Sequence, residues 1–263
     1  MKILTMEEIH SYLLTSLIDF DTYCRNHDVH YSLCGGTLIG AARHQGFVPW
    51  DDDTDVMMTR SEYDKLTQCW IEDPNPNYTL LTDGTENLTQ AGRCGKWYAN
   101  NTAPRHPKNE FDIGIFLDLF VADGLPHDKE QAKKYFMQVH YKGHDYYISY
   151  KHRNHPFFKF LYVMYPPYRP SAILKKIKKK LKEYPDTEAK YLAFIFGSSK
   201  DFDRELIPKQ YFDSFTTLYF EGHEFPVISE YDAYLRHYYG NYMEFPPEAE
   251  RVPEHDVNHT IRD

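Results

Sequence analysis

The sequence contains few cysteines and lacks any long apolar run. No stretch of about 18 apolar residues is present, so no membrane-spanning helix is predicted. The first residues, MKILTMEEIHSYLL, include Glu7 and Glu8 and lack the uninterrupted apolar segment of a signal peptide. No CxxC pair occurs, which argues against a disulfide framework or a zinc finger and is typical of reduced thiols. These absences together predict a cytoplasmic protein; the scattered cysteines are Cys24, Cys34, Cys69 and Cys94.

The chain also lacks an excess of positive charge. Its 30 Lys and Arg face 39 Asp and Glu, which gives a formal net charge of −9. Because nucleic acids are bound through positive surfaces, no nucleic-acid partner is predicted. Aromatic residues, in contrast, reach 16%, with 23 Tyr and 17 Phe. This is more than an ordinary core requires, and some of these rings are expected to line clefts or interfaces.

The apolar pattern predicts one α/β unit with a mixed sheet and an added helical portion. Thr5 and Glu8 predict a capping box for the first helix, Ser61 an N-cap for the third, and Asp123-Gly124 a turn. Helices are expected over residues 5–27, 37–44, 61–70, 129–152 and 230–239, and strands over 30–34, 53–58, 92–99 and 111–126. We expect residues 1–150 to form a core, 151–205 a basic and aromatic helical insertion, and 206–263 an element that completes the core.

Four aspartates crowd into the end of the segment YSLCGGTLIGAARHQGFVPWDDDTDVMMTR, residues 31–60. In a strand, side chains alternate, so Asp51, Asp53 and Asp55 would project together while Asp52 points away. Asp53 and Asp55 would lie about 7 Å apart, close enough for both carboxylates to reach one ion. Carboxylate oxygens without nearby His or Cys favour Mg²⁺, or Mn²⁺, over zinc. The spacing therefore predicts a metal site.

The double glycine upstream complements these acids. Gly35 and Gly36 would let the backbone approach an anion, and the helix beginning near Thr37 would direct free N–H groups at a phosphate. Taken alone, the double glycine could be a plain turn and the aspartates a solvated acidic loop. Their combination is typical of a nucleotidyltransferase-type site. A third carboxylate is expected from Asp118, in IFLDLF, where apolar neighbours make an unpaired charge costly. The alternative for Asp118 is pairing with a surface arginine.

The stretch GGTLIGAARHQGFVPWDDDTDVMMTRSEYDKL resembles the LicD family of phosphocholine transferases, whose relatives include fukutin and fukutin-related protein. GKWYANNT, FLDLFVADGLP and SEYDAYLRHYYGNYMEFPPEAERVPEH resemble further elements of the family in the same order. The resemblance covers most of the chain outside residues 155–205. It implies a nucleotidyltransferase-like fold and the transfer of a phosphorylated alcohol from a CDP-activated donor to a sugar hydroxyl, with release of CMP.

On the matching positions, the resemblance implies the site residues. Arg43 and Lys96 would add positive charge at the donor phosphates, and Asp118 would be the base, with His44 and His255 as alternatives. Asn241, which stands where the family commonly has Asp, is assigned no role. The implied metal ligands and catalytic residues are Asp51, Asp53, Asp55 and Asp118, and the substrate-binding residues are Gly35, Gly36, Thr37, Arg43, His44, Lys96 and His255.

The expected reaction is Mg²⁺-dependent transfer of phosphocholine from CDP-choline to a lipid-linked glycan, a teichoic acid or lipopolysaccharide precursor. Transfer from another donor such as CDP-ribitol stays open, as does a non-catalytic module that binds choline or lipid-linked glycan. A quaternary ammonium is held by aromatic faces. Trp50 and Trp97 are the tryptophans nearest to the expected site in sequence, although such a ring serves packing at least as often.

Residues 157–182 are aromatic first and strongly basic afterwards. The part ILKKIKKKLKEY places six lysines between Lys175 and Lys182 and four aliphatic residues on a separate helical face. Two interpretations stay open: a helix in a membrane interface, drawn by anionic lipids, or a core-packed helix with a solvated lysine face. The first would add peripheral contact with the inner face of the cell membrane.

Overall fold

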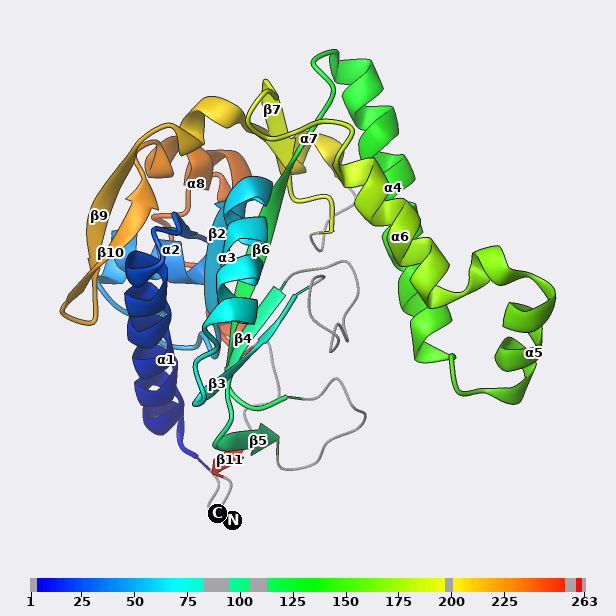
Figure 1. Ribbon diagram of the computed structural model, residues 1–263. Helices are drawn as coiled ribbons and strands as arrows, with labels where there is room; N and C mark the ends of the chain where they lie inside the picture. The colour runs from blue at the N-terminus through cyan, green and yellow to red at the C-terminus, as the bar shows by residue number, and fades with distance from the viewer. Residues whose placement is uncertain (1–3, 83–94, 105–112, 197–200, 254–258, 262–263) are drawn as a thin grey trace.

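A computed structural model describes residues 4–82, 95–104, 113–196, 201–253 and 259–261. Within these residues the chain forms a mixed sheet of seven strands (Figure 1), which confirms the predicted fold class. Its main path runs β1-β2-β6-β4-β3, and β7 and β8 extend the far end of β6. The strands are β1 (Ser32–Leu33), β2 (Thr54–Thr59), β3 (Tyr78–Leu81), β4 (Gly95–Ala99), β6 (Phe116–Gly124), β7 (Tyr191–Ala193) and β8 (Leu206–Pro208).

The register of the central strands aligns charged residues from three of them. β2 pairs with β6 in parallel, which sets Asp55 opposite Asp118. β4 pairs with β6 in the antiparallel sense, which sets Lys96 opposite the same Asp118. Residues opposite each other on paired strands project to the same side of a sheet. The sheet therefore gathers two carboxylates and an ammonium group on one face.

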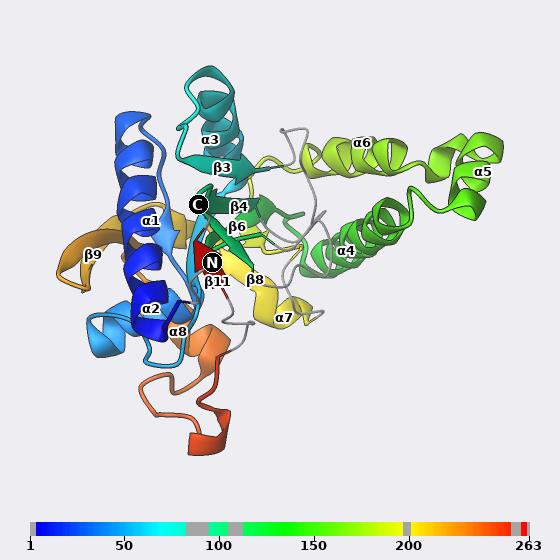
Figure 2. The same ribbon diagram turned by 90° about the horizontal axis from the view of Figure 1, so that it is seen from below.

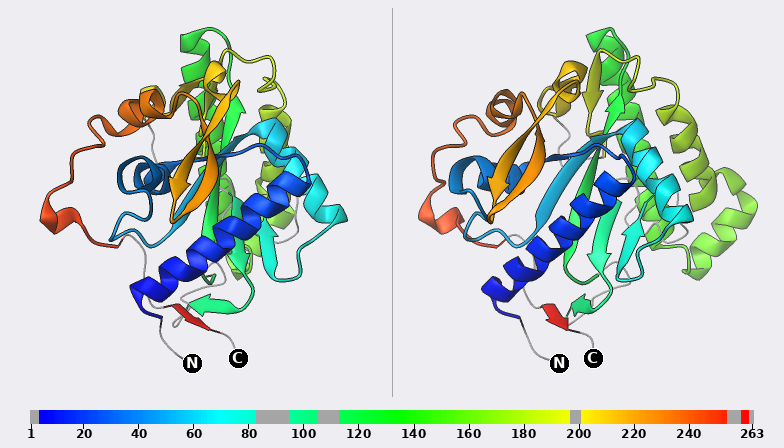
Figure 3. Two further views of the ribbon diagram at one scale, coloured as in Figure 1. Left: turned by 90° about the vertical axis from the view of Figure 1, so that its left-hand side faces the viewer. Right: turned by 60° about the vertical axis from the view of Figure 1, so that its left-hand side comes forward.

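The other face of the sheet carries the main core. Trp97, which follows Lys96 and so points the opposite way, is fully buried. Its indole contacts Phe20 of α1 (Met6–Asn26) and Trp70 of α3 (Arg60–Glu72), and both helices pack on this face. Figure 3 shows α1 running obliquely across the sheet. The large apolar side chains of α1 meet the core at helical spacing; those with no exposed surface are Leu13, Leu17 and Phe20.

The helical portion projects from the sheet as an arm, with α5 at its far end (Figure 2). It consists of α4 (Lys129–Lys151), α5 (Pro156–Met164), the 3₁₀ turn η1 (Pro166–Tyr168) and α6 (Pro170–Leu181). α4 and α6 pack against each other over a second apolar cluster, which includes Phe136, Val139, Ile173, Ile177 and Leu181. None of the described helices combines the length and the apolarity needed to cross a membrane.

The remaining elements are α2 (Gly35–His44), β5 (Thr102–Pro104), α7 (Phe202–Glu205), η2 (Lys209–Phe212), β9 (Phe215–Phe220), β10 (His223–Ile228), α8 (Tyr231–Tyr239), η3 (Glu248–Glu250) and β11 (His259–Ile261). Most of them lie beside α2 or near the lower edge of the sheet, and α7 contacts α4 and α8 (Figure 1). β9 and β10 form a hairpin, β10 contacts β1, and β11 pairs with β5.

Several local predictions are confirmed and two are wrong. The capping box of Thr5 and Glu8 is present, and the helices expected over residues 129–152 and 230–239 agree with α4 and α8 to within one residue. Ser61 is not an N-cap, because α3 begins at Arg60 after Thr59. Asp123-Gly124 is not a turn either, because both residues continue β6 and pair with β7.

Ser61 and Asp123 both make contacts at the base of the arm. Asp186, in the segment that returns from the arm, accepts hydrogen bonds from the backbone N–H of Ser61 at 3.1 Å and from its hydroxyl at 2.7 Å. Arg60 donates to the buried carboxylate of Asp123 at 2.7 Å. The start of α3 is therefore capped by a residue distant in sequence, which no local pattern shows.

Candidate active site

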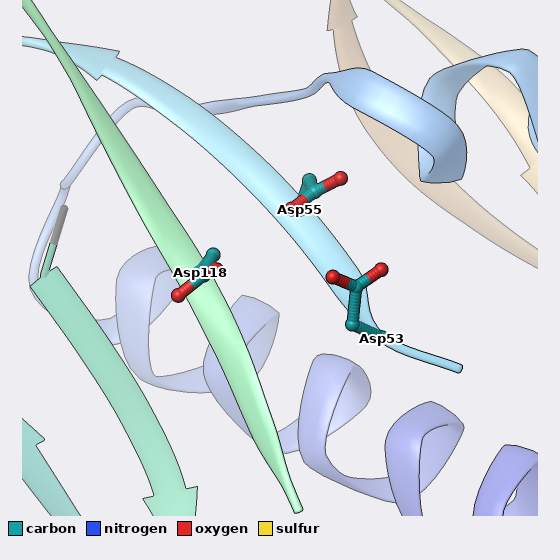
Figure 4. A group of neighbouring side chains, drawn as sticks. All are labelled: Asp53, Asp55 and Asp118. Atoms are coloured by element: carbon teal, nitrogen blue, oxygen red, sulfur yellow. The ribbon is translucent and has the colours of Figure 1, made fainter. Parts of the chain in front are cut away.

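Three aspartates converge on the face of the sheet opposite α1 and α3. Asp53 immediately precedes β2, Asp55 lies within it, and Asp118 lies on β6 (Figure 4). One oxygen from each carboxylate lies within 4.8 Å of the others. Two oxygens on opposite sides of a Mg²⁺ ion are about 4.2 Å apart, so small side-chain rotations would suffice to bind one. The donor set, oxygen atoms without His or Cys, fits a hard cation of this kind.

The electrostatics of Asp55 point to the same requirement. Burial, followed by the charges of Asp53, Asp118 and Asp51, raises the pKa of Asp55 well above its ordinary value, while Lys96 acts in the opposite sense. Carboxylates held this close repel one another, and a cation between them removes the repulsion. The site is thus built to bind positive charge.

Lys96 supplies part of that charge. Its ammonium group binds Asp118 Oδ1 directly and lies 3.6 Å from the centroid of the Phe116 ring. Both side chains of the ion pair are nearly buried. Among the described residues, the lysine opposite Asp118 on β4 is a partner of this carboxylate, and Lys96 offsets the cost of burying it.

The double glycine brings α2 against the acidic residues. Gly35 has a φ of +55°, and a Cβ added there would overlap the Asp55 carboxylate; one added at Gly36 would overlap that of Asp51. The hydroxyl of Thr37 accepts a hydrogen bond from the Asp55 backbone N–H at 2.8 Å. The glycines thus make room for these carboxylates, and the role of α2 at a phosphate stays a prediction.

Asp51 occupies a different place from its two neighbours. β2 begins only at Thr54, so the strand alternation that would align Asp51 with Asp53 and Asp55 does not extend back to it. Asp51 lies in the preceding loop beside Gly36, outside the group of three. Its charge still raises the pKa of Asp55, and its role as a metal ligand stays a prediction.

Arg43 and His44 lie at the opposite end of α2, against the C-terminal segment. Arg43 Nη1 donates to the carbonyl oxygens of Tyr242 at 2.6 Å and Glu244 at 3.0 Å. Its guanidinium lies 4.7 Å from the Phe245 ring centroid, and the His44 ring meets the same ring edge-on. Burial lowers the pKa of His44, which favours the neutral imidazole that a general base requires.

The two tryptophans considered in the sequence analysis lie in different surroundings. Trp97 packs in the core, so it is not available to hold a choline group. Trp50 lies near Phe245, and Arg251 lies 5.7 Å from its ring centroid and 5.4 Å from that of Phe245. The sequence analysis assigned Arg251 no role, although the arginine belongs to the C-terminal stretch FPPEAERVPEH that resembles the family.

Two further ionisable groups escaped the sequence analysis, and the first of them lies near Asp55. Burial and the nearby Asp55 raise the pKa of Tyr239, which keeps its hydroxyl protonated. Burial also raises the pKa of Glu205 to about 7, although the Tyr238 hydroxyl donates to it at 3.0 Å. The motif YGNYM, which begins at Tyr239, was the available signal for the first group. His255 lies outside the described residues.

The fold and the site together define a nucleotidyltransferase-type transferase. The family model described as LicD/FKTN/FKRP, nucleotidyltransferase domain, matches residues 28–103, which include the double glycine, the acidic loop and Lys96. The lipopolysaccharide cholinephosphotransferase LicD of Haemophilus influenzae is 30% identical over 260 residues, 97% of each chain. An uncharacterised protein of Rickettsia prowazekii, RP689, is 27% identical over 163 residues, 59% of this chain and 58% of that one. The chain belongs to the LicD family, and it is homologous to a cholinephosphotransferase over nearly its whole length.

Proposed function

We propose that this protein transfers phosphocholine from CDP-choline to a sugar hydroxyl of a lipid-linked glycan, a teichoic acid or lipopolysaccharide precursor, and releases CMP. The observation that carries the proposal is the convergence of Asp53, Asp55 and Asp118 on a fold shared with the LicD family. The 97% coverage of a lipopolysaccharide cholinephosphotransferase supports the choice of donor and acceptor.

Asp53, Asp55 and Asp118 would hold Mg²⁺, or Mn²⁺. When bound, the ion would neutralise charge that develops on the donor diphosphate as CMP leaves. Lys96 fixes the position of the Asp118 carboxylate through Oδ1. Gly35 and Gly36 hold the start of α2 beside the acidic loop, where its N–H groups would face the donor phosphates.

The chemical step needs a base at the acceptor hydroxyl. The acceptor oxygen forms a bond to the phosphorus of phosphocholine, and the bond from that phosphorus to the CMP oxygen breaks. We assign the acceptor proton to the Asp118 carboxylate, because it lies beside Asp53 and Asp55 on the same face of the sheet. His44 and His255 stay the alternative bases that the sequence predicts, and His44 lies at the end of α2 opposite Gly35.

Two other functions use the same fold. Transfer of ribitol phosphate or another CDP-activated alcohol would need the same carboxylates and a different headgroup site. A non-catalytic module that binds choline or lipid-linked glycan would need none of them. The pairing of Lys96 with Asp118 beside Asp53 and Asp55 favours catalysis. We place the reaction at the inner face of the cell membrane, because the proposed acceptor is built on a lipid.

Incubation with a panel of CDP-alcohols and Mg²⁺, with CMP release followed by mass spectrometry, tests the donor. We expect CMP from CDP-choline and none from the Asp53→Asn variant. CMP from CDP-ribitol alone would replace choline with an alditol. No CMP from any donor, in the presence of a lipid-linked glycan acceptor, would favour the binding module.

A further inference from the structure

The far end of the arm presents an apolar face to solvent. Phe157, Phe160 and Met164 follow one another along one side of α5 and are 62%, 65% and 56% exposed. Soluble proteins seldom leave contiguous large apolar side chains in water unless the patch binds something. The adjoining exposed residues are Val163, Tyr165, Pro166, Pro167 and Tyr168.

This face is held in a fixed orientation. Tyr162 is the buried residue of α5, nearly opposite Phe160 on the helix, and its hydroxyl donates to the Ser149 carbonyl of α4 at 2.6 Å. The Ser149 hydroxyl donates to the Tyr168 carbonyl at 2.8 Å, and Arg169 Nε donates to the Tyr162 carbonyl at 2.8 Å. These bonds turn the aromatic face of α5 away from α4.

The apolar tip is surrounded by positive charge. Residues 146–182 contain ten Lys and Arg and no Asp or Glu, in a chain whose net charge is −9. Lys159 is exposed within α5, and Lys175 and Lys176 are exposed in the middle of α6, whose first residue follows η1 closely. A second copy of the chain would bring two such basic segments together, so charge disfavours self-association through this face.

A segment that binds a lipid surface needs an apolar contact and a charged contact, and here two different helices supply them. The apolar side of α6, with Ile173, Ile177 and Leu181, packs against α4 and is closed to any partner. Its lysines lie on the remaining surface. α5 is the reverse case, since most of its apolar side chains are exposed. The apolar contact and the charged contact thus come from neighbouring helices.

We propose that α5 and η1 dock the protein on an anionic lipid surface. Phe157 and Phe160 enter the headgroup region, and Lys159, Lys175 and Lys176 face lipid phosphates, as in peripheral proteins that combine aromatic and basic residues. The docking does not involve the carboxylate site. It deepens the proposed function, on which its biological purpose rests, because a lipid-linked acceptor would be met at the same surface.

Sedimentation with phosphatidylcholine vesicles, with and without phosphatidylglycerol, measures the docking. The protein should bind the anionic vesicles, and added salt should weaken the binding. Phe157→Ser/Phe160→Ser should lower the partition coefficient at least roughly tenfold. Ile71→Ser removes an equally exposed apolar side chain from α3 and should leave binding unchanged.

Paired lysine variants test the charge. Lys175→Gln/Lys176→Gln should lower the partition coefficient roughly thirtyfold, because each basic residue near an anionic surface adds about a fivefold gain. Lys133→Gln/Lys134→Gln, an exposed pair near the other end of the arm, is the matched control and should have a much smaller effect. CMP release with a detergent-solubilised acceptor should stay unchanged in all four variants, which separates loss of docking from loss of catalysis.

A Trp placed at the tip gives an independent reading. The fluorescence of Phe160→Trp should shift to shorter wavelength with anionic vesicles, whereas that of Ile71→Trp should not. The proposal is overturned if wild-type protein does not sediment with anionic vesicles, if neutral vesicles bind it equally, or if each variant behaves like its control. A loss of dimer in Phe157→Ser/Phe160→Ser with unchanged vesicle binding would assign the face to a second copy.

Discussion

At the scale of single residues, the site depends on aspartate carboxylates that the fold holds close together despite their mutual repulsion. Asp55 carries most of this cost, since burial and three neighbouring carboxylates all raise its pKa. A residue in this situation weakens the fold unless a ligand is bound. The proposed metal site would explain why the fold holds Asp55 here at this cost.

Replacing Asp55 with Asn should abolish activity without harming the fold. The change keeps the size of the side chain and removes one of the repelling charges, so the melting temperature without metal should stay the same or rise. Turnover should fall about a thousandfold or more, because the proposed ion loses a ligand. Asp73→Asn, at an exposed position, is the control for both assays. Normal turnover in Asp55→Asn would refute the metal site.

Gly35 tests how closely α2 must approach the acids. Gly35 and Gly222 both have positive φ, but an added Cβ would overlap Asp55 only at Gly35 and meets open space at Gly222. Gly222→Ala should therefore lower the free energy of unfolding by about 1 kcal/mol from backbone strain alone. Gly35→Ala should cost more and should also reduce CMP release. If urea titrations gave equal losses of stability for Gly35→Ala and Gly222→Ala, the close approach of α2 to Asp55 would have no importance.

Glu205 should make stability depend on pH. Burial raises its pKa from 4.5 to about 7, so the folded protein binds this proton more tightly than the unfolded chain does. The protonated Glu205 side chain contributes its full stability below pH 4.5, and this contribution is lost as the pH rises to about 7. The free energy of unfolding should therefore fall by roughly 3 kcal/mol over that range. In Glu205→Gln this part of the decline should be absent. Parallel pH profiles for the two proteins would contradict the account.

At the scale of elements, the start of α3 joins the arm to the sheet. Asp186 returns from the arm to cap α3, and Arg60 in the first turn of α3 pairs with Asp123 at the end of β6. The arm is thereby fixed to the sheet by buried polar contacts as well as by apolar packing.

Asp186→Ala should therefore loosen the base of the arm. Loss of the cap should lower the free energy of unfolding by about 1 to 2 kcal/mol and raise hydrogen exchange at the first amides of α3. Glu188→Ala, at an exposed position in the same segment, is the control and should change neither quantity. Unchanged exchange in Asp186→Ala would show that the cap contributes nothing.

At the scale of the whole molecule, the sequence predicted what is local and missed what depends on pairing. The acidic loop was evident because its charges lie within five positions, and Asp118 because large apolar residues flank it. The ion pair of Lys96 with Asp118 could not be predicted, since it depends on how β4 and β6 pair. The partners of Arg43 lie about 200 residues away, in a segment with no periodic pattern.

The same limit applies to the basic helix. Its amphipathic pattern is equally consistent with a lipid surface and with another helix, and only the packing of α6 on α4 decides between them. The exposed face of α5 is likewise visible only once its neighbours are in place. Nonlocal contacts thus determine which apolar residues are buried and which remain for a partner.

The most direct measurement of the central claim is the anomalous signal of Mn²⁺ in a crystal soaked with MnCl₂ and CMP. The account predicts a peak among the carboxylates of Asp53, Asp55 and Asp118, with a nucleotide phosphate on its open side. The account would be contradicted if the nucleotide were bound at full occupancy with no Mn²⁺ peak among these side chains. A Mn²⁺ peak at another place, with the three carboxylates pointing apart, would contradict it as well.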